Sequence, residues 1–260
     1  MPLIVCSPST KNFIEGEHFV VTSPPKKDIL KHVGKYKEVI AIGGGAVIDT
    51  AKILSSTPII CYPTTASGAS ATSHSVYWDG NNKLNYVSFK PKNVYFNSEF
   101  IKTLPKTTLL HTKYDAISHC LDVMWSKDYF KLNQSKVEST LNKLLQPNIE
   151  PIDIIKLGHE AGTFIEKVPT TILHALSYPL TGMYNLSHGK ALGFLISPVC
   201  RIMGFTSCSS LEKLNNFVEF DAEVITHEAQ QYPKFFNTKN KIDINQLIQE
   251  LNNEKNNLLN

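Results

Sequence analysis

Hydrophobic residues follow two different periods along this chain, and the change falls near residue 104. Before that point, four short runs rich in Val, Ile and aromatic residues are separated by turn-forming residues, which is the pattern of β-strands. The runs occupy residues 18–23, 38–43, 58–63 and 93–97. Buried strands that alternate with helical segments are typical of a parallel sheet covered by helices, so we expect such a sheet here.

From residue 105 onward, apolar residues recur at spacings of three and four, which predicts α-helices. The clearest segments are residues 104–125, 135–145 and 153–167. The tail, 244–260, begins as an amphipathic helix and ends in polar residues, where we expect fraying. The chain is therefore predicted to be an α/β protein, with a parallel-sheet domain over 1–104 and an all-helical domain over 105–260.

Composition and charge narrow the classes of protein. The 260 residues carry a formal net charge of +3, so nothing indicates a nucleic-acid or membrane-surface partner. No apolar run approaches the length of a membrane span, and no basic segment followed by a long apolar stretch opens the chain. The five cysteines form no CxxC pair, which favours free thiols in a reducing compartment. We therefore expect a cytoplasmic protein.

A strand followed by three glycines indicates a phosphate-binding turn. In EVIAIGGGAVIDTAK, residues 38–52, the predicted strand leads into Gly43, Gly44 and Gly45, and a helix then begins. Glycines let backbone amides approach a ligand closely, and the following helix N-terminus offers unpaired N–H groups to an anion. The spacing differs from the GxGxxG fingerprint, so an ordinary strand-to-helix turn is the alternative.

The next predicted strand is followed by a segment of small polar residues. Residues 61–73, CYPTTASGASATS, are dense in hydroxyl groups, among them those of Thr64, Thr65 and Ser70. Such side chains can donate hydrogen bonds to a ribose or a nicotinamide and leave room for it. An ordinary polar loop is the alternative interpretation.

One carboxylate and three imidazoles in largely apolar segments indicate a metal site. Asp115 and His119 lie four residues apart in a predicted helix, so they share one of its faces. His174 follows in an apolar helical segment, and His188 precedes a glycine. Burying such groups without partners is costly, and together they make a complete ligand set for Fe(II) or Zn(II). For any single histidine, a hydrogen-bonded core residue is the alternative.

Five motifs, in this order, resemble the iron-containing (group III) alcohol dehydrogenases: GGGAVIDTAK, PTTASG, DAISH, HALSYPLT and SHGKALG. The resemblance implies a dehydroquinate synthase-like architecture, with an active site between a dinucleotide-binding domain and a helical metal-binding domain. It places the metal ligands at Asp115, His119, His174 and His188. A ligand at His119 favours the alcohol dehydrogenase branch over the synthase and glycerol dehydrogenase branches.

The resemblance also implies roles in binding NAD or NADP and in catalysis. The residues that it places around the cofactor are Gly43, Gly44, Gly45, Ala46, Asp49, Thr64 and Thr65. An active-site lysine of many members aligns with Lys83. Tyr178 stands where many members have a histidine, and a tyrosine there can orient a substrate hydroxyl or join a proton relay.

The implied activity is hydride transfer between the nicotinamide and a small aldehyde or alcohol. A metal would act there as a Lewis acid on the substrate oxygen. HALSYPLT and HCLDVMWS resemble the form found in phosphonoacetaldehyde reductases, which form 2-hydroxyethylphosphonate. A homodimer is also expected from the resemblance.

Departures from the family leave two alternatives open. Family members are typically longer, so we expect a protein shortened at both ends. Ala46 replaces the usual serine, which removes one side-chain contact and leaves the backbone cradle. The first alternative is a homologue that binds nucleotide or metal with weakened catalysis. The second is a synthase or lyase of the same superfamily, for which Arg201, the only arginine, provides few cationic anchors.

Overall fold

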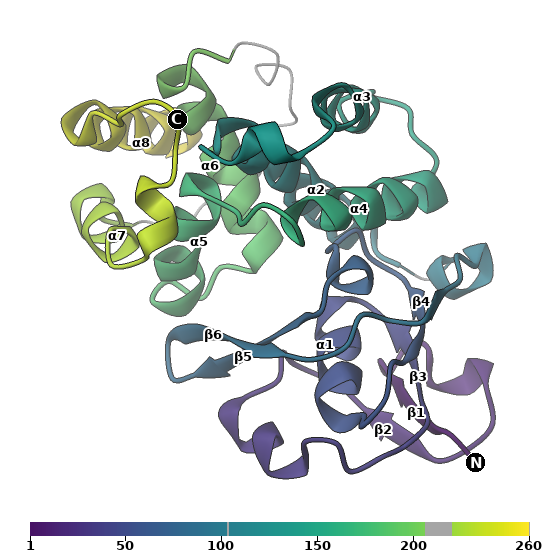
Figure 1. Ribbon diagram of the computed structural model, residues 1–260. Helices are drawn as coiled ribbons and strands as arrows, with labels where there is room; N and C mark the ends of the chain where they lie inside the picture. Colours follow the sequence, from purple (N-terminus) through teal and green to yellow (C-terminus); the bar gives the residue numbers. More distant parts are fainter. Residues whose placement is uncertain (103, 206–219, 260) are drawn as a thin grey trace.

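The structure, a computed structural model, describes residues 1–102, 104–205 and 220–259, which form a sheet part and a helical part (Figure 1). The sheet part holds five strands in the order β2-β1-β3-β4-β7, and all neighbouring strands are parallel. The strands are β1 (Leu3–Cys6), β2 (His18–Val20), β3 (Val39–Gly43), β4 (Ile60–Pro63) and β7 (Asn93–Val94). The predicted fold class is confirmed.

Hydrophobic runs locate the strands better than they locate strand ends. Of the run 18–23 only residues 18–20 are strand, and of 93–97 only 93–94. Strand β1 was not predicted from the sequence, although all four of its residues are buried. A run of four apolar residues does not distinguish a strand from a helix, which explains the omission.

Side chains of β3 alternate between two apolar layers. Ala41 belongs to a cluster with Ile48 of α1 (Gly45–Leu54), which covers one face of the sheet. Ile42 faces the other side, where Phe100 packs against it. Among the described residues, this second face packs against aromatic side chains such as Tyr62 and Phe100, whereas α1 covers the first face.

The helical part contains seven α-helices over the described residues. They are α2 (Lys106–Trp125), α3 (Gln134–Leu144), α4 (Pro151–Ile165), α5 (Ile172–Gly182), α6 (His188–Ile202), α7 (Ala222–Ala229) and α8 (Ile244–Leu259). α2 contacts α3, α4, α5 and α6, and its Ile117 and Leu121 are fully buried. α8 continues to Leu259, where the sequence predicted fraying. In the described part of the chain, no helix has both the length and the apolar character needed to cross a lipid bilayer.

A β-hairpin that the sequence analysis missed reaches from the sheet part to α5 (Figure 1). β5 (His74–Asp79) and β6 (Asn82–Val87) are antiparallel, and Gly80 in their turn has a positive φ of 58°. The Asp-Gly dipeptide at this turn is a recognised hairpin signal. A Cβ on Gly182 would lie 2.7 Å from the carbonyl oxygen of Asn81, so the hairpin tip packs directly against the end of α5.

Two glycines on α4 let the loop after β4 pack against the helical part. A Cβ on Gly158 would lie 2.4 Å from the backbone of Ala66. One on Gly162 would lie 2.5 Å from the carbonyl oxygen of Gly68. Since no side chain fits at these distances, the two glycines allow the close approach that joins the sheet part to the helices.

Candidate metal centre and dinucleotide site

Four side chains from three helices converge on one point. Asp115 and His119 lie one turn apart on α2, His174 is the third residue of α5, and His188 is the first residue of α6. The Nε2 atoms of His119, His174 and His188 lie 3.4 Å, 3.5 Å and 3.9 Å from Asp115 Oδ1. The structure therefore brings together all four residues that the sequence analysis proposed as metal ligands.

Three of these residues fit a divalent metal in the spacing of their donor atoms, and two of the donor atoms lack a hydrogen-bond partner among the described residues. Asp115, His119 and His174 each offer one ligand atom, and these atoms lie within 4.8 Å of one another. Zinc bonds of roughly 2.1 Å in a tetrahedron put neighbouring ligand atoms about 3.4 Å apart, close to the two shorter distances above. Asp115 Oδ1 and His174 Nε2 are buried without a hydrogen-bond partner among the described residues. A bound cation would satisfy both atoms, which are otherwise costly to bury.

Burial alone would lower the pKa of His174, but contacts with Asp115 and Asp122 outweigh it and raise that pKa, whereas burial keeps the other two imidazoles neutral. Burial lowers the pKa of His119 to about 4 and holds the pKa of His188 well below its ordinary value. Burial alone would raise the pKa of Asp115, but the close approach of His119, His174 and His188 outweighs it and lowers that pKa. The carboxylate is therefore ionised and these two imidazoles are neutral at pH 7, as metal ligands must be.

Asp122, which the sequence analysis did not single out, fixes the orientation of His174. Its side chain is fully buried, and its Oδ2 accepts a hydrogen bond of 2.7 Å from His174 Nδ1. The same carboxylate accepts the backbone N–H groups of Leu173 and His174, so it caps the N-terminus of α5 from α2. The sequence could have indicated Asp122, because it lies one turn after His119 on the helical face that carries Asp115.

We expect Asp122→Asn to weaken metal affinity by roughly 10–100-fold, the usual effect of removing such an outer carboxylate. An amide has one acceptor oxygen, whereas Asp122 accepts four hydrogen bonds from Thr171, Leu173 and His174. Competition with a chromogenic chelator measures the affinity. Asp153→Asn is the matched control, because Asp153 is exposed on α4; equal losses in the two variants would contradict the role given to Asp122.

His188 is held by a second hydrogen bond, and Lys83 lies directly beside it. His188 Nδ1 lies 3.3 Å from Ser177 Oγ, which in turn donates to the carbonyl of His174. This arrangement makes Nδ1 the protonated nitrogen and leaves a lone pair on Nε2. Lys83 Nζ, from β6, donates to that Nε2 at 3.1 Å. The lysine predicted from the sequence therefore lies at the edge of the metal site.

Tyr178 lies one turn after His174, between two lysines. It is buried, and its hydroxyl accepts a hydrogen bond of 2.8 Å from Lys234 Nζ. The Nζ atoms of Lys83 and Lys234 lie 4.8 Å and 5.0 Å from the centre of its ring. Burial alone would raise the pKa of Tyr178, but the positive charges of Lys234 and Lys83 outweigh it and lower that pKa to about 8. Lys234 could not be singled out from the sequence, because no motif surrounds it.

The glycine turn joins β3 to α1, and packing explains its composition. Gly43 ends the strand and Gly45 begins the helix, yet none of the three glycines has a positive φ. A Cβ on Gly44 would lie 2.9 Å from Thr65 Cγ2, and one on Gly45 would lie 2.9 Å from Ser67 Oγ. The helix has no side-chain cap at its N-terminus, so its first N–H groups suit a phosphate.

Two unpartnered hydroxyl groups lie beside this helix N-terminus. Thr65 Oγ1 and Ser67 Oγ are buried, and neither has a hydrogen-bond partner among the residues that the structure describes. Ala46, which follows Gly45 in the first turn of α1, is half-buried. Hydroxyl donors in this position fit the phosphate or ribose of a dinucleotide. Ser67 lies within the hydroxyl-rich loop, but the sequence analysis did not name it.

Three other residues proposed around the cofactor are engaged within the protein. Thr64 donates its backbone N–H to the carbonyl of Gly43 at 3.0 Å. Ser70 Oγ lies 2.9 Å from His159 Nδ1, and Asp49 forms an ion pair of 3.3 Å with Lys52. These contacts hold the nucleotide-side loop in place, and a direct contact of the three residues with a cofactor stays a prediction.

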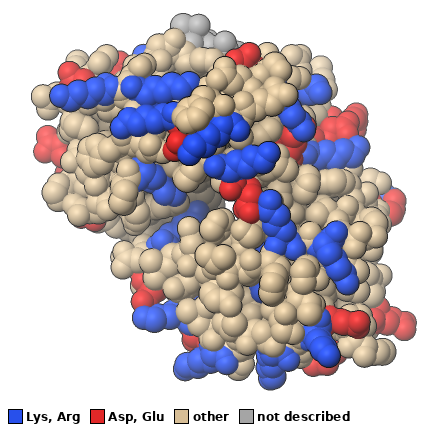
Figure 2. All heavy atoms as spheres, in the orientation of Figure 1, with Lys and Arg blue, Asp and Glu red and all other residues tan. Residues whose placement is uncertain are grey.

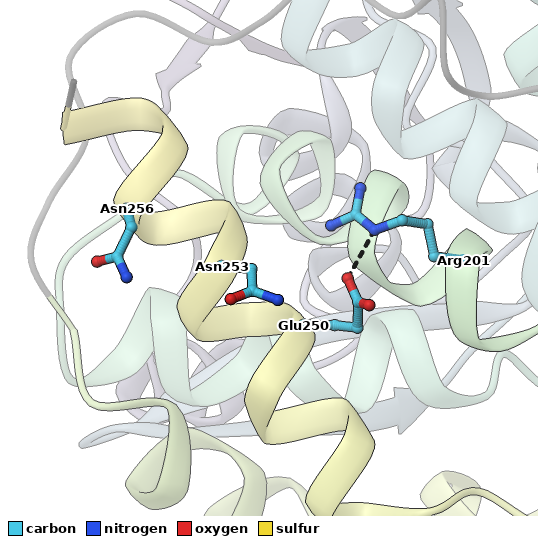
Figure 3. Close-up of a pocket in the computed structure, with 4 residues that line it drawn as sticks. All are labelled: Arg201, Glu250, Asn253 and Asn256. Carbon is cyan, nitrogen blue, oxygen red and sulfur yellow. Dashed lines mark hydrogen bonds and ion pairs between the residues drawn. The ribbon is translucent and has the colours of Figure 1, made fainter.

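Arg201 lies at the opposite end of α6 from His188, about 20 Å away along the helix. It lines a surface pocket with Glu250, Asn253 and Asn256 (Figure 3). Its guanidinium pairs with Glu250 at 2.7 Å and with Glu254 at 2.9 Å. The only arginine of the chain therefore provides no anchor for a ligand at the metal centre.

Curated proteins with related sequences are mainly dehydrogenases and reductases, although no family model matches the chain. The chain is 27% identical over 204 residues to the 4-hydroxybutyrate dehydrogenase of Clostridium kluyveri. The alignment covers 63% of this chain and 54% of that protein. It is 25% identical over 205 residues to the phosphonoacetaldehyde reductase of Streptomyces viridochromogenes, in an alignment that covers 62% of this chain and 52% of that protein. The chain thus spans about half the length of these curated relatives.

Solved structures show which fold this is. A crystal structure of an iron-containing alcohol dehydrogenase aligns with a TM-score of 0.81 at 19% identity, covering 97% of this chain and 91% of that one. The sulfoacetaldehyde reductase of Bifidobacterium kashiwanohense, solved in complex with NAD+, aligns with a TM-score of 0.78 at 18% identity, covering 97% and 90%. The chain has the fold of the iron-containing alcohol dehydrogenases, as the sequence motifs predicted.

Proposed function

We propose that this chain transfers hydride between NAD or NADP and a small aldehyde or its alcohol, using Fe(II) or Zn(II) held by Asp115, His119, His174 and His188. The observation that carries this proposal is the convergence of an unpartnered carboxylate oxygen with three imidazole nitrogens beside the dinucleotide-type loop. A Cβ on Gly68 would lie 3.2 Å from the His119 ring, so this loop touches a metal ligand. Cofactor and metal would therefore be neighbours.

The residues of the site have separate roles in this proposal. A divalent cation held by these four residues would supply Lewis acidity to the substrate oxygen, and a bound nicotinamide would carry the hydride. Asp122 keeps His174 in one orientation and tautomer. The glycine turn and the hydroxyls of Thr65 and Ser67 bind and orient the dinucleotide. The Tyr178 hydroxyl, hydrogen-bonded to a lysine, donates the proton that the product alcohol gains.

The relatives support the reaction class and offer candidate substrates. A 4-hydroxybutyrate dehydrogenase and a phosphonoacetaldehyde reductase are both alcohol–aldehyde oxidoreductases by name. Phosphonoacetaldehyde, which HALSYPLT and HCLDVMWS favour, is accordingly one member of the substrate panel below. The cytoplasmic location and the homodimer stay predictions; sedimentation of the purified protein tests the second.

Absorbance of the nicotinamide in metal-loaded protein tests the proposal. Protein stripped with a chelator, then loaded with Fe(II) under anaerobic conditions or with Zn(II), is mixed with NADH or NADPH and a panel of small aldehydes. We expect oxidation of the nicotinamide only in the loaded protein, with loss on chelation and recovery on reloading. Binding of metal and nucleotide without oxidation by any aldehyde would instead favour the weakened homologue. Conversion of a substrate without net oxidation of the nicotinamide would favour a synthase or lyase.

A further inference from the structure

We propose that Lys83 and Lys234 form a subsite for an anionic group on the substrate, so that the chain acts on small aldehydes carrying a carboxylate or a phosphonate. The inference rests on the proposed function and names its substrate class. It is carried by two lysines from distant parts of the chain that lie beside the same tyrosine at the metal centre.

The elements that present these lysines are well anchored. Lys83 lies on β6, in the hairpin whose tip packs against Gly182 of α5. Lys234 lies in a short 3-10 turn, Pro233–Phe236, whose Phe235 is fully buried. Both Nζ atoms lie within about 5 Å of the Tyr178 ring centre, although the lysines are far apart in sequence. The fold therefore gathers two cations at one edge of the site.

Carboxylates do not neutralise this pair. Over the described residues, neither Lys83 nor Lys234 forms an ion pair with Asp or Glu, whereas other lysines such as Lys52 do. Asp115 is shared among three imidazoles, and Asp49 is engaged by Lys52. A divalent cation would add further positive charge, and a concentration of one sign attracts an anionic substrate.

Hydrogen-bond donors are also left for a ligand. A lysine ammonium has three N–H groups. Lys234 donates to Tyr178 at 2.8 Å and to Thr170 Oγ1 at 3.1 Å, which leaves one donor. Lys83 donates to the Nε2 atom of His188. If His188 binds a metal, the metal takes the lone pair of this Nε2 atom, and the N–H group of Lys83 becomes free for a ligand. Each ammonium group can then donate to an oxygen of an anionic group beside Tyr178.

The position suits a substrate group rather than the cofactor phosphates. Dinucleotide phosphates would lie at the glycine turn, whereas the two lysines flank Tyr178 beside His188. On the face shown in Figure 2, Lys or Arg side chains lie at the hollow between the helical part and the sheet part. A small aldehyde with its oxygen near the metal ligands would place an anionic group two or three bonds away within reach of these side chains.

Lys234→Met, compared with Lys234→Arg, tests the subsite in full-length, metal-loaded protein. Lys239→Met is the matched control, because Lys239 also lies over a tyrosine ring, that of Tyr129, beyond the far end of α2. The first readout is binding of methylphosphonate by calorimetry, with NADH present. The second is the ratio of kcat/KM for phosphonoacetaldehyde or 4-oxobutanoate to kcat/KM for butanal.

We expect Lys234→Met to weaken methylphosphonate binding and to lower the kcat/KM ratio, each by roughly 10–100-fold, the cost of a charge-assisted hydrogen bond. Lys234→Arg should recover much of the loss, and Lys239→Met should match the wild type. Equal use of anionic and neutral aldehydes by the wild type, or equal ratios in Lys234→Met and wild type, would overturn the inference. Should no aldehyde be reduced, the proposed function fails, and methylphosphonate binding still decides the subsite.

Discussion

Replacement of Asp115 by asparagine is expected to empty the metal site and to lower hydride transfer by a factor on the order of 10³, the effect of losing several kcal/mol of Lewis-acid stabilisation. Asp115 Oδ1 lies within 3.9 Å of all three imidazole nitrogens and carries the only negative charge among the four proposed ligands. A neutral amide leaves a divalent cation without this charge. Elemental analysis of metal per chain and nicotinamide absorbance measure the two effects.

Asp128→Asn is the control for that variant, because Asp128 lies just beyond α2 and pairs with Lys131 at the surface. It should retain metal and activity. Metal loading should also raise the melting temperature of wild-type protein and of the control but not of Asp115→Asn, because only a protein that binds the ion gains stability from it. Full metal content in Asp115→Asn would show that the ion binds elsewhere.

Lys52→Met is expected to lower the free energy of unfolding by about 3–5 kcal/mol, the usual cost of breaking a buried ion pair from one side. Lys52 is 2% exposed, and its Nζ donates to the carbonyls of Ala69, Thr72 and His74 while it pairs with Asp49. Methionine fills similar space but leaves a carboxylate buried without a counter-ion. Urea unfolding followed by circular dichroism measures the change.

The pH dependence of the free energy of unfolding of Lys52→Met shows whether the unpaired Asp49 carboxylate causes the loss of stability. Burial raises the pKa of Asp49 even beside Lys52, and loss of the lysine raises it further. A raised folded-state pKa means that stability is lost as pH rises through it, so the defect of Lys52→Met should shrink on acidification. Adding Asp49→Asn to Lys52→Met should recover part of the lost free energy of unfolding. Lys27→Met, which removes an exposed ion pair with Asp79, should unfold like wild type. A defect that is independent of pH would point to packing instead.

Local patterns in the sequence were sufficient for the elements nearest the chemistry. Strand β3, the glycine turn and the helix after it were predicted because hydrophobic run, glycines and helical period follow one another without interruption. Asp115 and His119 were placed on one helical face because their four-residue spacing is a property of the helix itself. The hairpin was missed despite its Asp-Gly turn, because polar residues interrupt its two strands and only one of their residues is fully buried.

Local sequence patterns could not predict contacts between segments that are distant in the chain. Lys234 reaches Tyr178 across 56 residues, and the carboxylate of Asp122 orients His174 across 52. Gly158 of α4 looked like an ordinary helix residue until the backbone of Ala66 was found against it. Each of these depends on how helices and loops pack, which no local period encodes.

What the sequence determined by itself was the kind of chemistry: a carboxylate and three imidazoles among apolar residues need a shared partner wherever they are buried, and motif order related them to a family. What only the tertiary structure decided was which side chains surround that partner. Helix packing turned four scattered residues into one site, supplied Asp122 behind it, and placed at its edge two lysines that form no ion pair within the described part of the chain. Spacing along a chain specifies one face of a helix, whereas a binding site is made where several faces meet.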